Sequence, residues 1–429
     1  MSGASKVIID YGEHGLTFDM PDDANVTVLR PTFQSALSNA AQSLREALKN
    51  PIDAPPLGSM VNASDHVAIV FSDFTRPVPN RMVLPAVIES LPAMPDTHIH
   101  LFNATGTHRN NTPEELRGLL GEEIAGRFRV IQNNASDKSS YVKAGVTSGG
   151  NDIWLLREFL ACDFCILTGS IEPHFFAGFS GGGKAVMPGL AALESIERNH
   201  SSRNLDHPNA AWGVTHGNPI WEEIQEASMM VDPDFLVNVS LNRDKAITGI
   251  FAGDISSAYA IGCEFVRNSV MAPVSDPFDI VITSNSGFPL DRNLYQAVKG
   301  MSAASRIVKR GGAIIIAAEC RDGVPTGSPF ENLLSLSGSP QKLLEMTDDP
   351  NFRHPESWQA RILASIVRKA EVHLYSERLT DTEIRNAWLN PCHCIESELL
   401  QLMEKYGKDA RVCVLPEGPV TVPYLSVSS

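Results

Sequence analysis

Residues 172–189 read EPHFFAGFSGGGKAVMPG and follow the apolar run 164–167. The apolar run is typical of a buried strand. Residues 190–198, after the glycine-rich segment, are typical of a helix, and His200 comes just beyond them. The sequence therefore predicts a strand, a polar loop and a helix in this order, which is the repeating unit of an α/β fold.

The glycine run in this loop favours a site for a phosphate group. Gly181, Gly182 and Gly183 allow the backbone to approach a ligand closely. Backbone N–H groups beside Ser180 could cradle an anion, with Lys184 at the end of the run. The spacing matches neither G-x-x-x-x-G-K-[ST] nor G-x-G-x-x-G. A plain glycine turn with an exposed lysine is the alternative interpretation.

The same unit recurs along the chain, so we expect two α/β domains with mostly parallel sheets. Two prolines and a change in composition at 271–277 place the boundary between domains 1–272 and 273–429. We also expect a hairpin at 7–18, a helix at 32–48 and, at 323–355, a longer irregular stretch with some helix that could be a lid over the cleft. Strands are predicted at 66–71, 97–102, 127–132, 164–167, 235–239, 246–251, 279–283, 312–318, 371–375 and 411–415.

Polar loops follow several of these strands, and ligands of open parallel sheets bind beyond the carboxyl ends of the strands. Side chains that are far apart in the sequence should therefore converge at one edge of the first sheet. These residues are Asp73, Arg76, His108, His174 and Lys184.

Composition excludes some classes of protein. The 429 residues are 43% hydrophobic and 20% charged, and the formal net charge of −15 argues against nucleic acid or an anionic membrane as the main partner. No run of ~20 apolar residues is present. Seven cysteines without regular spacing indicate free thiols in a reducing compartment, and hence a cytoplasmic protein.

Single residues leave alternatives open. Asp73 and Arg76 could fix their own proline-rich loop, or Arg76 could bind a carboxylate. One histidine is weak support for a site, but three at one edge of a sheet indicate proton transfer or metal ligation. His207 and His216, in a polar loop, stay ambiguous.

Several motifs, taken together and in order, resemble the nickel-dependent lactate racemase family over nearly the whole chain. They are SDFTRPVP at 72–79, GTHR at 106–109, HFFAGFSGGGK at 174–184, PG at 188–189, NH at 199–200 and YQAVKGMS at 295–302.

The resemblance implies a cofactor, the nickel pincer nucleotide, which is a pyridinium mononucleotide with two sulfur arms around nickel. Lys184 would hold it through a thioamide bond, and His200 would be the nickel ligand from the protein. The loop 180–183 would take its phosphate, with Asp73 and Thr75 close by. Members of the family often carry a basic residue directly before the lysine, where this chain has Gly183, which puts one phosphate contact in doubt.

The resemblance also implies roles for the substrate side of the site, in a cleft between the domains. His108 and His174 would be an acid/base pair serving opposite faces of a 2-hydroxy acid, with lactate as the default substrate. A base takes the hydroxyl proton while the cofactor accepts a hydride, and the hydride returns after the carbonyl has rotated. The implied substrate-binding residues are Arg76, Phe176, Tyr295, Gln296, Lys299 and Trp358.

Two rival functions are less consistent with these residues. A nicotinamide-dependent 2-hydroxy-acid dehydrogenase is disfavoured because the G-x-G-x-x-G fingerprint is missing. A non-catalytic protein that binds anionic metabolites is disfavoured because all the implied catalytic residues are intact. The expected partners are a small 2-hydroxy acid and the host enzymes that make the cofactor, with no nucleic acid and no membrane.

Overall fold

The computed structural model describes residues 5–22, 24–32, 34–349, 352, 354–407 and 409–426. The chain divides into two compact units, Phe33–Ser269 and a unit formed by Met1–Thr32 with Val270–Ser429. Within the described ranges, no helix has both the length and the apolar character needed to cross a membrane. The α/β class with mostly parallel sheets is confirmed, and each unit is described by itself below.

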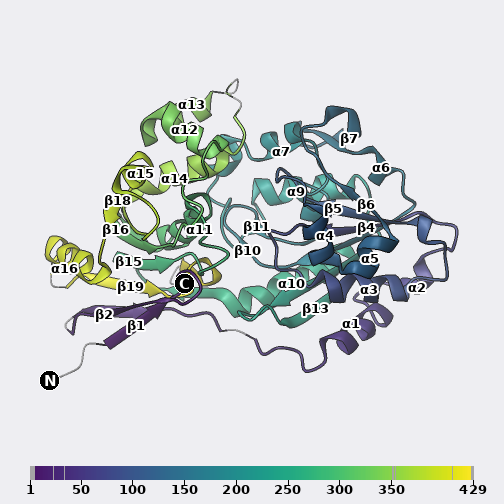
Figure 1. Cartoon of the computed structure of the whole chain (residues 1–429), viewed down its shortest axis with the longest axis horizontal. Helices are drawn as coiled ribbons and strands as arrows, with labels where there is room; N and C mark the ends of the chain where they lie inside the picture. The colour runs from purple at the N-terminus through teal and green to yellow at the C-terminus, as the bar shows by residue number, and fades with distance from the viewer. Residues whose placement is uncertain are drawn as a thin grey trace. The chain divides into compact units, whose positions relative to one another are not determined.

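The sheet of the unit Phe33–Ser269 has the strand order β13-β12-β9-β4-β5-β6. Strands β4, β5, β6 and β13 of this sheet are labelled in Figure 1. All neighbours are parallel except β12 and β13, which run antiparallel. The chain proceeds from β4 to β6 on one side and then continues with β9 on the other side of β4. The strands are β4 (Val67–Ser72), β5 (Ile99–Ala104), β6 (Arg129–Gln132), β9 (Phe164–Ser170), β12 (Phe235–Leu241) and β13 (Ile247–Gly253).

One face of this sheet packs on helices that follow or precede its strands. Alternate residues of β4, such as Val67, Ile69 and Phe71, are fully buried there with Leu44 and Val83 from the helices. Alternation places every second side chain of a strand on the same face. The helices on this face are α1 (Ala40–Lys49), α3 (Asn80–Ser90), α4 (Pro113–Leu120) and α5 (Glu122–Arg127).

The sheet of the other unit has the order β18-β17-β16-β15-β19-β3, and all its pairs are parallel. Its apolar residues alternate between two core clusters, one on each face. The strands are β3 (Asn25–Val28), β15 (Phe278–Ser284), β16 (Val308–Ala317), β17 (Glu371–Tyr375), β18 (Asn390–Cys392) and β19 (Arg411–Leu415).

Helices α11 (Leu294–Ser305) and α14 (Ser357–Lys369) cover one face of this second sheet, since Val298 and Leu363 belong to the same core cluster as Val281. Helix α16 (Ile395–Tyr406) and a hairpin, β1 (Ser5–Ile9) with β2 (Leu16–Met20), cover the other face.

The first residues of the chain correct the predicted domain limits. The sequence assigned 1–32 to the N-terminal domain, but these residues belong to the unit of Val270–Ser429. The physical reason is strand pairing, because β3 extends the second sheet by pairing with β19. The predicted hairpin is present as β1 and β2, and β3 was not predicted.

Several other elements differ from the expected ones. The helix expected at 32–48 begins only at Ala40, because the side chain of Asn39 accepts the backbone N–H of Gln42 and caps it there. The helix expected within the stretch 323–355 is present as α12 (Pro329–Ser337) and α13 (Pro340–Asp348). The hairpin of β7 (Tyr141–Val146) and β8 (Asp152–Leu156) was not predicted.

Candidate active site

The loop after β4 presents Asp73, which is 2% exposed. Its Oδ1 accepts hydrogen bonds from the backbone N–H of Thr75 at 3.2 Å and from the Thr75 hydroxyl at 2.6 Å. This local turn, in which an aspartate accepts from the residue two positions on, is a common way to close a loop. It leaves the second carboxylate oxygen, Oδ2, turned away from the loop.

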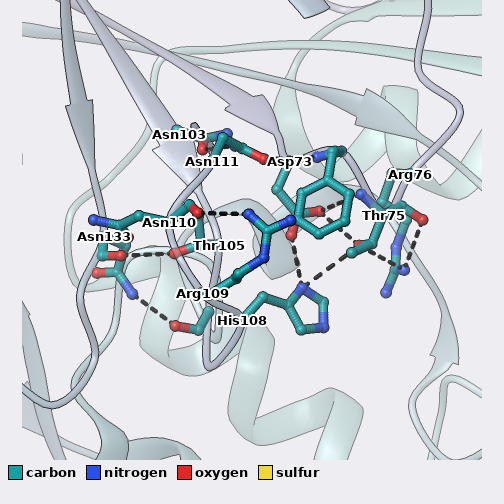
Figure 2. Close-up of polar contacts among 12 residues, drawn as sticks. Asp73, Thr75, Arg76, Asn103, Thr105, His108, Arg109, Asn110, Asn111 and Asn133 are labelled. Carbon is teal, nitrogen blue, oxygen red and sulfur yellow. Dashed lines mark hydrogen bonds and ion pairs between the residues drawn. The ribbon is translucent and has the colours of Figure 1, made fainter. Parts of the chain in front are cut away.

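Oδ2 of Asp73 lies 2.7 Å from Nδ1 of His108, in the loop after β5 (Figure 2). Burial disfavours the charged carboxylate, but the hydrogen bond and charge of His108 and the charge of Arg76 outweigh it and hold the pKa of Asp73 below its ordinary value. An ionised carboxylate only accepts, so Nδ1 of His108 carries the hydrogen. In the neutral ring, Nε2 then carries the lone pair of a base.

Arg76 lies beside this pair (Figure 2). Its Nη1 donates to the backbone carbonyl of Thr75 at 3.4 Å and to the Thr75 hydroxyl at 3.3 Å. These contacts are long and leave the guanidinium available to an anion as well. A loop-fixing role and a carboxylate-binding role, the two alternatives left open by the sequence, are thus compatible in this geometry.

A second group of residues surrounds the ring of Phe176, which is 4% exposed. The ring centroid lies 4.5 Å from that of His174, 4.8 Å from that of His200 and 5.9 Å from Nζ of Lys184. His174 belongs to a short hairpin, β10 (Pro173–His174) with β11 (Gly178–Phe179), that the sequence did not predict. Phe176 is therefore buried among three of the predicted site residues.

His200 is 7% exposed and lies at the C-terminal cap of α7 (Leu193–Asn199). Burial, followed by the positive charge of Lys184, lowers the pKa of His200 from 6.5 to about 3. The imidazole is neutral near pH 7, which is the form that binds metal ions.

His174 differs from His108 in the nitrogen that is engaged. Nδ1 of His174 accepts the backbone N–H of Ala177 at 3.2 Å. The neutral ring therefore carries its hydrogen on Nε2, the opposite tautomer to that of His108. Before any reaction, the lone pair of the neutral ring is therefore on Nε2 in His108 and on Nδ1 in His174.

The loops that carry these two groups meet within the unit. The backbone N–H of Gly106, two residues before His108, donates to the carbonyl of Gly189 at 3.1 Å. Asn133, fully buried after β6, donates from Nδ2 to the carbonyl of Gly106 at 3.0 Å. The sequence pattern did not single out Asn133, although it follows a strand end just as Asp73 does.

The glycine run is closely packed against distant parts of the unit. A Cβ at Gly181 would lie 2.4 Å from Oδ1 of Asn238, and one at Gly182 would lie 2.8 Å from the ring of Tyr259. Both glycines also have positive φ, +77° and +55°. The N–H of Gly182 donates to Asn238, and the Ser180 hydroxyl donates to the carbonyl of Ser170. Close packing thus requires glycine at both positions, and the phosphate site in this loop stays a prediction.

The expected substrate residues of the second domain lie in the other unit. Tyr295, Gln296 and Lys299 are on α11, and Nζ of Lys299 donates to Oε1 of Gln296 at 2.7 Å. Trp358 is 7% exposed on α14. Their approach to the histidines across a cleft stays a prediction.

The two ambiguous histidines lie away from these contacts. His207 is exposed, and its Nδ1 accepts the N–H of Asn209, whereas His216 packs edge-on against Trp221 at 5.8 Å. All seven cysteines are free thiols, as predicted. Among the residues that the structure describes, no group of three or more His, Cys, Asp or Glu side chains is arranged to hold a metal ion.

Two family models match the chain: residues 11–213 match the lactate racemase N-terminal domain, and residues 274–422 match the lactate racemase C-terminal domain. The chain belongs to the lactate racemase family. The predicted family resemblance is thereby confirmed, and membership supports racemase activity, which is an isomerase function.

Individual lactate racemases resemble the chain over nearly its whole length. Lactate racemase of Lactiplantibacillus plantarum is 35% identical over 415 residues, covering 96% of this chain and 97% of the relative. That of Thermoanaerobacterium thermosaccharolyticum is 33% identical over 422 residues, covering 96% and 98%.

Solved structures show the same fold. The lactate racemase apoprotein from T. thermosaccharolyticum superposes with a TM-score of 0.92 at 31% identity, covering 98% of this chain and all of that one. A protein from Thermotoga maritima, at 19% identity and a TM-score of 0.67, covers 92% of this chain and all of that one, and shares the fold alone.

Proposed function

We propose that the chain racemises or epimerises a 2-hydroxy acid, with lactate as the first substrate to test. The observation that supports this most directly is the contact of 2.7 Å between buried Asp73 and Nδ1 of His108. It leaves the lone pair of the neutral His108 ring on Nε2, in a protein of the lactate racemase family. General acid–base catalysis needs such a base within reach of the proton that it removes.

The proton that His108 takes is the hydroxyl proton. The α-hydrogen of a 2-hydroxy acid is not acidic near neutral pH, so the carbon centre has to lose hydrogen as a hydride. Bound nickel pincer nucleotide would supply the hydride acceptor, with Lys184 as its covalent attachment and His200 as the nickel ligand from the protein. The oxidised substrate is a 2-keto acid, whose carbonyl can present either face.

The residues present fit such a group. His200 is buried with a lowered pKa, so its imidazole is neutral and can donate a lone pair to a metal. Lys184 is close enough to lower that pKa and lies beside the ring of Phe176, which also contacts His200. Ser180, Gly181, Gly182 and Gly183 shape the loop before Lys184, and we propose that Asp73 and Thr75 border the same site.

His174 serves the opposite face in this proposal. Its Nε2–H can donate a hydrogen bond to the substrate oxygen in the starting tautomer. To act as a base, the ring has to carry its hydrogen on Nδ1, where the N–H of Ala177 now donates. Exchange of a proton by His174 therefore requires the contact with Ala177 to open.

The substrate carboxylate needs cations. We propose Arg76 from the first unit and Lys299 from the second, with Tyr295, Gln296, Phe176 and Trp358 lining the site. A guanidinium matches a carboxylate in geometry, and an ammonium adds a point charge. Cofactor-biosynthesis enzymes of the host would have to supply the nucleotide, and we place the protein in the cytoplasm with them.

The decisive experiment is a racemisation assay with cofactor-loaded protein and pure enantiomers of several 2-hydroxy acids. Inversion of one enantiomer without accumulation of keto acid is expected. Stoichiometric release of keto acid with reduction of added nicotinamide would support the dehydrogenase, and binding without turnover would support the non-catalytic protein.

The metal assignment has its own test. His200→Ala should lower the nickel content of the loaded protein, measured by elemental analysis, whereas His108→Ala should leave it unchanged. Intact-protein mass should show a large covalent adduct that disappears in Lys184→Ala. Equal nickel in both histidine variants would overturn the assignment of His200.

A further inference from the structure

Glu223 connects to the candidate site although nothing in the sequence pointed to it. It lies on α9 (Pro219–Met229) and is half-buried. Its Oε1 accepts the hydroxyl of Thr147 at 2.9 Å, and its Oε2 accepts Nδ2 of Asn199 at 2.8 Å and Nδ2 of Asn151 at 3.3 Å. Three donors directed at one carboxylate hold it in a single orientation.

Asn199 connects the oriented carboxylate of Glu223 to His200. It is fully buried, and its Nδ2 donates both to Glu223 and to the backbone carbonyl of Ile220 at 3.2 Å. Both partners can only accept, so the amide nitrogen has to face them. The amide oxygen then faces the other way, 2.9 Å from Nδ1 of His200.

The direction of the last contact follows by the same logic. An amide oxygen only accepts, so Nδ1 of His200 carries the hydrogen. A neutral imidazole has one N–H, and its lone pair is therefore on Nε2. The carboxylate of Glu223, which does not contact the His200 ring, therefore determines that Nε2 is the nitrogen without hydrogen.

We propose that Glu223 is a positioning residue that sets the metal-binding nitrogen of His200 through Asn199. The inference rests on the proposed function, in which His200 is the nickel ligand. Histidine ligands of metals commonly donate their other ring N–H to a neighbouring acceptor, which fixes both the tautomer and the ring orientation. Here the acceptor is an amide that is itself held by Glu223.

The tautomer can be read in the full-length protein without cofactor. Long-range ¹H–¹⁵N correlation spectra distinguish an Nδ1–H from an Nε2–H ring, and His200→Gln assigns the signal. We expect the wild type to show Nδ1–H. Asn199→Leu, which keeps the volume and removes the acceptor, should shift His200 mainly to Nε2–H.

Glu223 is tested with a matched control on the same helix. Glu226, one turn further along α9, also accepts from the turn after β7, through the N–H and hydroxyl of Ser148 at 2.6 and 2.9 Å. Glu223→Ala should populate the Nε2–H signal of His200, while Glu226→Ala, which leaves the bond between Glu223 and Asn199 in place, should not. Glu223→Gln, whose amide oxygen can still accept from Asn199, should keep most of the Nδ1–H form that Glu223→Ala loses.

Nickel provides the second readout. Loaded Asn199→Leu and Glu223→Ala proteins should retain nickel ~10–100-fold less tightly in a chelator competition, the usual cost of removing an outer partner of a metal ligand. Should Asn199→Leu fail to fold, Glu223→Ala and Glu223→Gln carry the test.

The failures of the two proposals are distinguishable. An unchanged Nδ1–H signal in folded Glu223→Ala, or an equal change in Glu226→Ala, would overturn the role of Glu223 and leave the proposed racemase standing. Unchanged nickel in His200→Gln would overturn the ligand itself, whatever the tautomer.

Discussion

The two parallel sheets use their carboxyl edges in different ways. The strand order reverses in each sheet, between β4 and β9 in one unit and between β15 and β19 in the other. Such reversal points are where open α/β sheets bind ligands, because the following loops diverge and leave a crevice. In the first unit, this edge carries Asp73, and the chain after β9 leads to His174.

In the second unit, the chain's own N-terminal turn occupies the equivalent edge. The N–H of Asp10 donates to the carbonyl of Pro416, after β19, at 2.9 Å, and the N–H of Phe288, after β15, donates to the carbonyl of Gly12 at 2.8 Å. Asp291, fully buried, accepts the N–H groups of Gly12 at 2.8 Å and Glu319 at 3.0 Å.

This difference shows that two sheets with a similar reversal of strand order can use that edge differently. In the proposed function, polar groups at the first edge take part in the chemistry, so their loss should reduce activity more than stability. Polar groups at the second edge satisfy backbone donors, so their loss should reduce stability more than activity.

The largest effect should come from Lys184→Ala. We expect no detectable racemisation, because the cofactor has no attachment, with a free energy of unfolding within ~1 kcal/mol of the wild type, as for a side chain outside the core. Racemase assays and chemical denaturation of the same preparation check this, with exposed Lys49→Ala as control. Full activity in folded Lys184→Ala would contradict the role of this edge.

Asp73→Asn should reduce kcat by ~10²–10⁴-fold, the range for loss of general acid–base function. An asparagine can present its oxygen to His108, but it removes the negative charge that stabilises the protonated ring. The check is kcat and KM for both enantiomers of the substrate. An unchanged kcat with a raised KM would instead assign Asp73 to binding alone.

Asp291→Ala should show the opposite pattern. Two buried backbone N–H groups, of Gly12 and Glu319, lose their acceptor, which costs about 1–3 kcal/mol for each unsatisfied group. We expect a lower denaturation midpoint and an unchanged kcat per folded molecule at a temperature where the variant is folded. If stability were unchanged and activity lost, the contrast between the two edges would fail.

The smallest expected effect is on how the stability of the protein without cofactor depends on pH. The folded-state pKa of His200 is lowered to about 3 from 6.5. Between these values the unfolded chain binds a proton there that the folded protein does not, so stability is greatest above pH 6.5 and falls as the pH falls toward 3. The slope is up to ~1.4 kcal/mol per pH unit.

His200→Gln should remove this contribution. The difference in unfolding free energy between the two proteins should be constant above pH 6.5 and should shift steadily in favour of the variant below it. Denaturant titrations at pH 8, 6 and 5 measure it, and parallel curves throughout would show that His200 is not buried as a neutral ring.

The sequence by itself determined the repeating strand–loop–helix pattern and, through it, the α/β class. Apolar runs such as 67–71 indicate a parallel strand that is buried on both faces. This pattern can be recognised without reference to the rest of the chain. The sequence also indicated that Asp73 and His108 would meet, because both follow neighbouring parallel strands. The family motifs pointed to Lys184 and His200.

Only the tertiary structure decided what these groups contact. The phosphate loop predicted at 181–183 stays a prediction, and only the fold shows that Asn238 and Tyr259, distant in sequence, pack closely against Gly181 and Gly182. Glu223 carried no local signal, because a glutamate on a helix is ordinarily a solvated residue. The pairing of β3 with β19 joins residues almost 400 positions apart, roughly as far as the chain allows, and no local pattern encodes it.

The physical reason for this division is the separation along the chain of the residues that each interaction joins. The alternation of side chains along a strand and their spacing along a helix are local properties, so periodicity in the sequence reveals them. Hydrogen-bond direction, tautomer and burial depend on which distant groups the fold brings within about 3 Å. The opposite tautomers of His108 and His174 follow from Asp73 and the N–H of Ala177, contacts that exist only once the loops are folded.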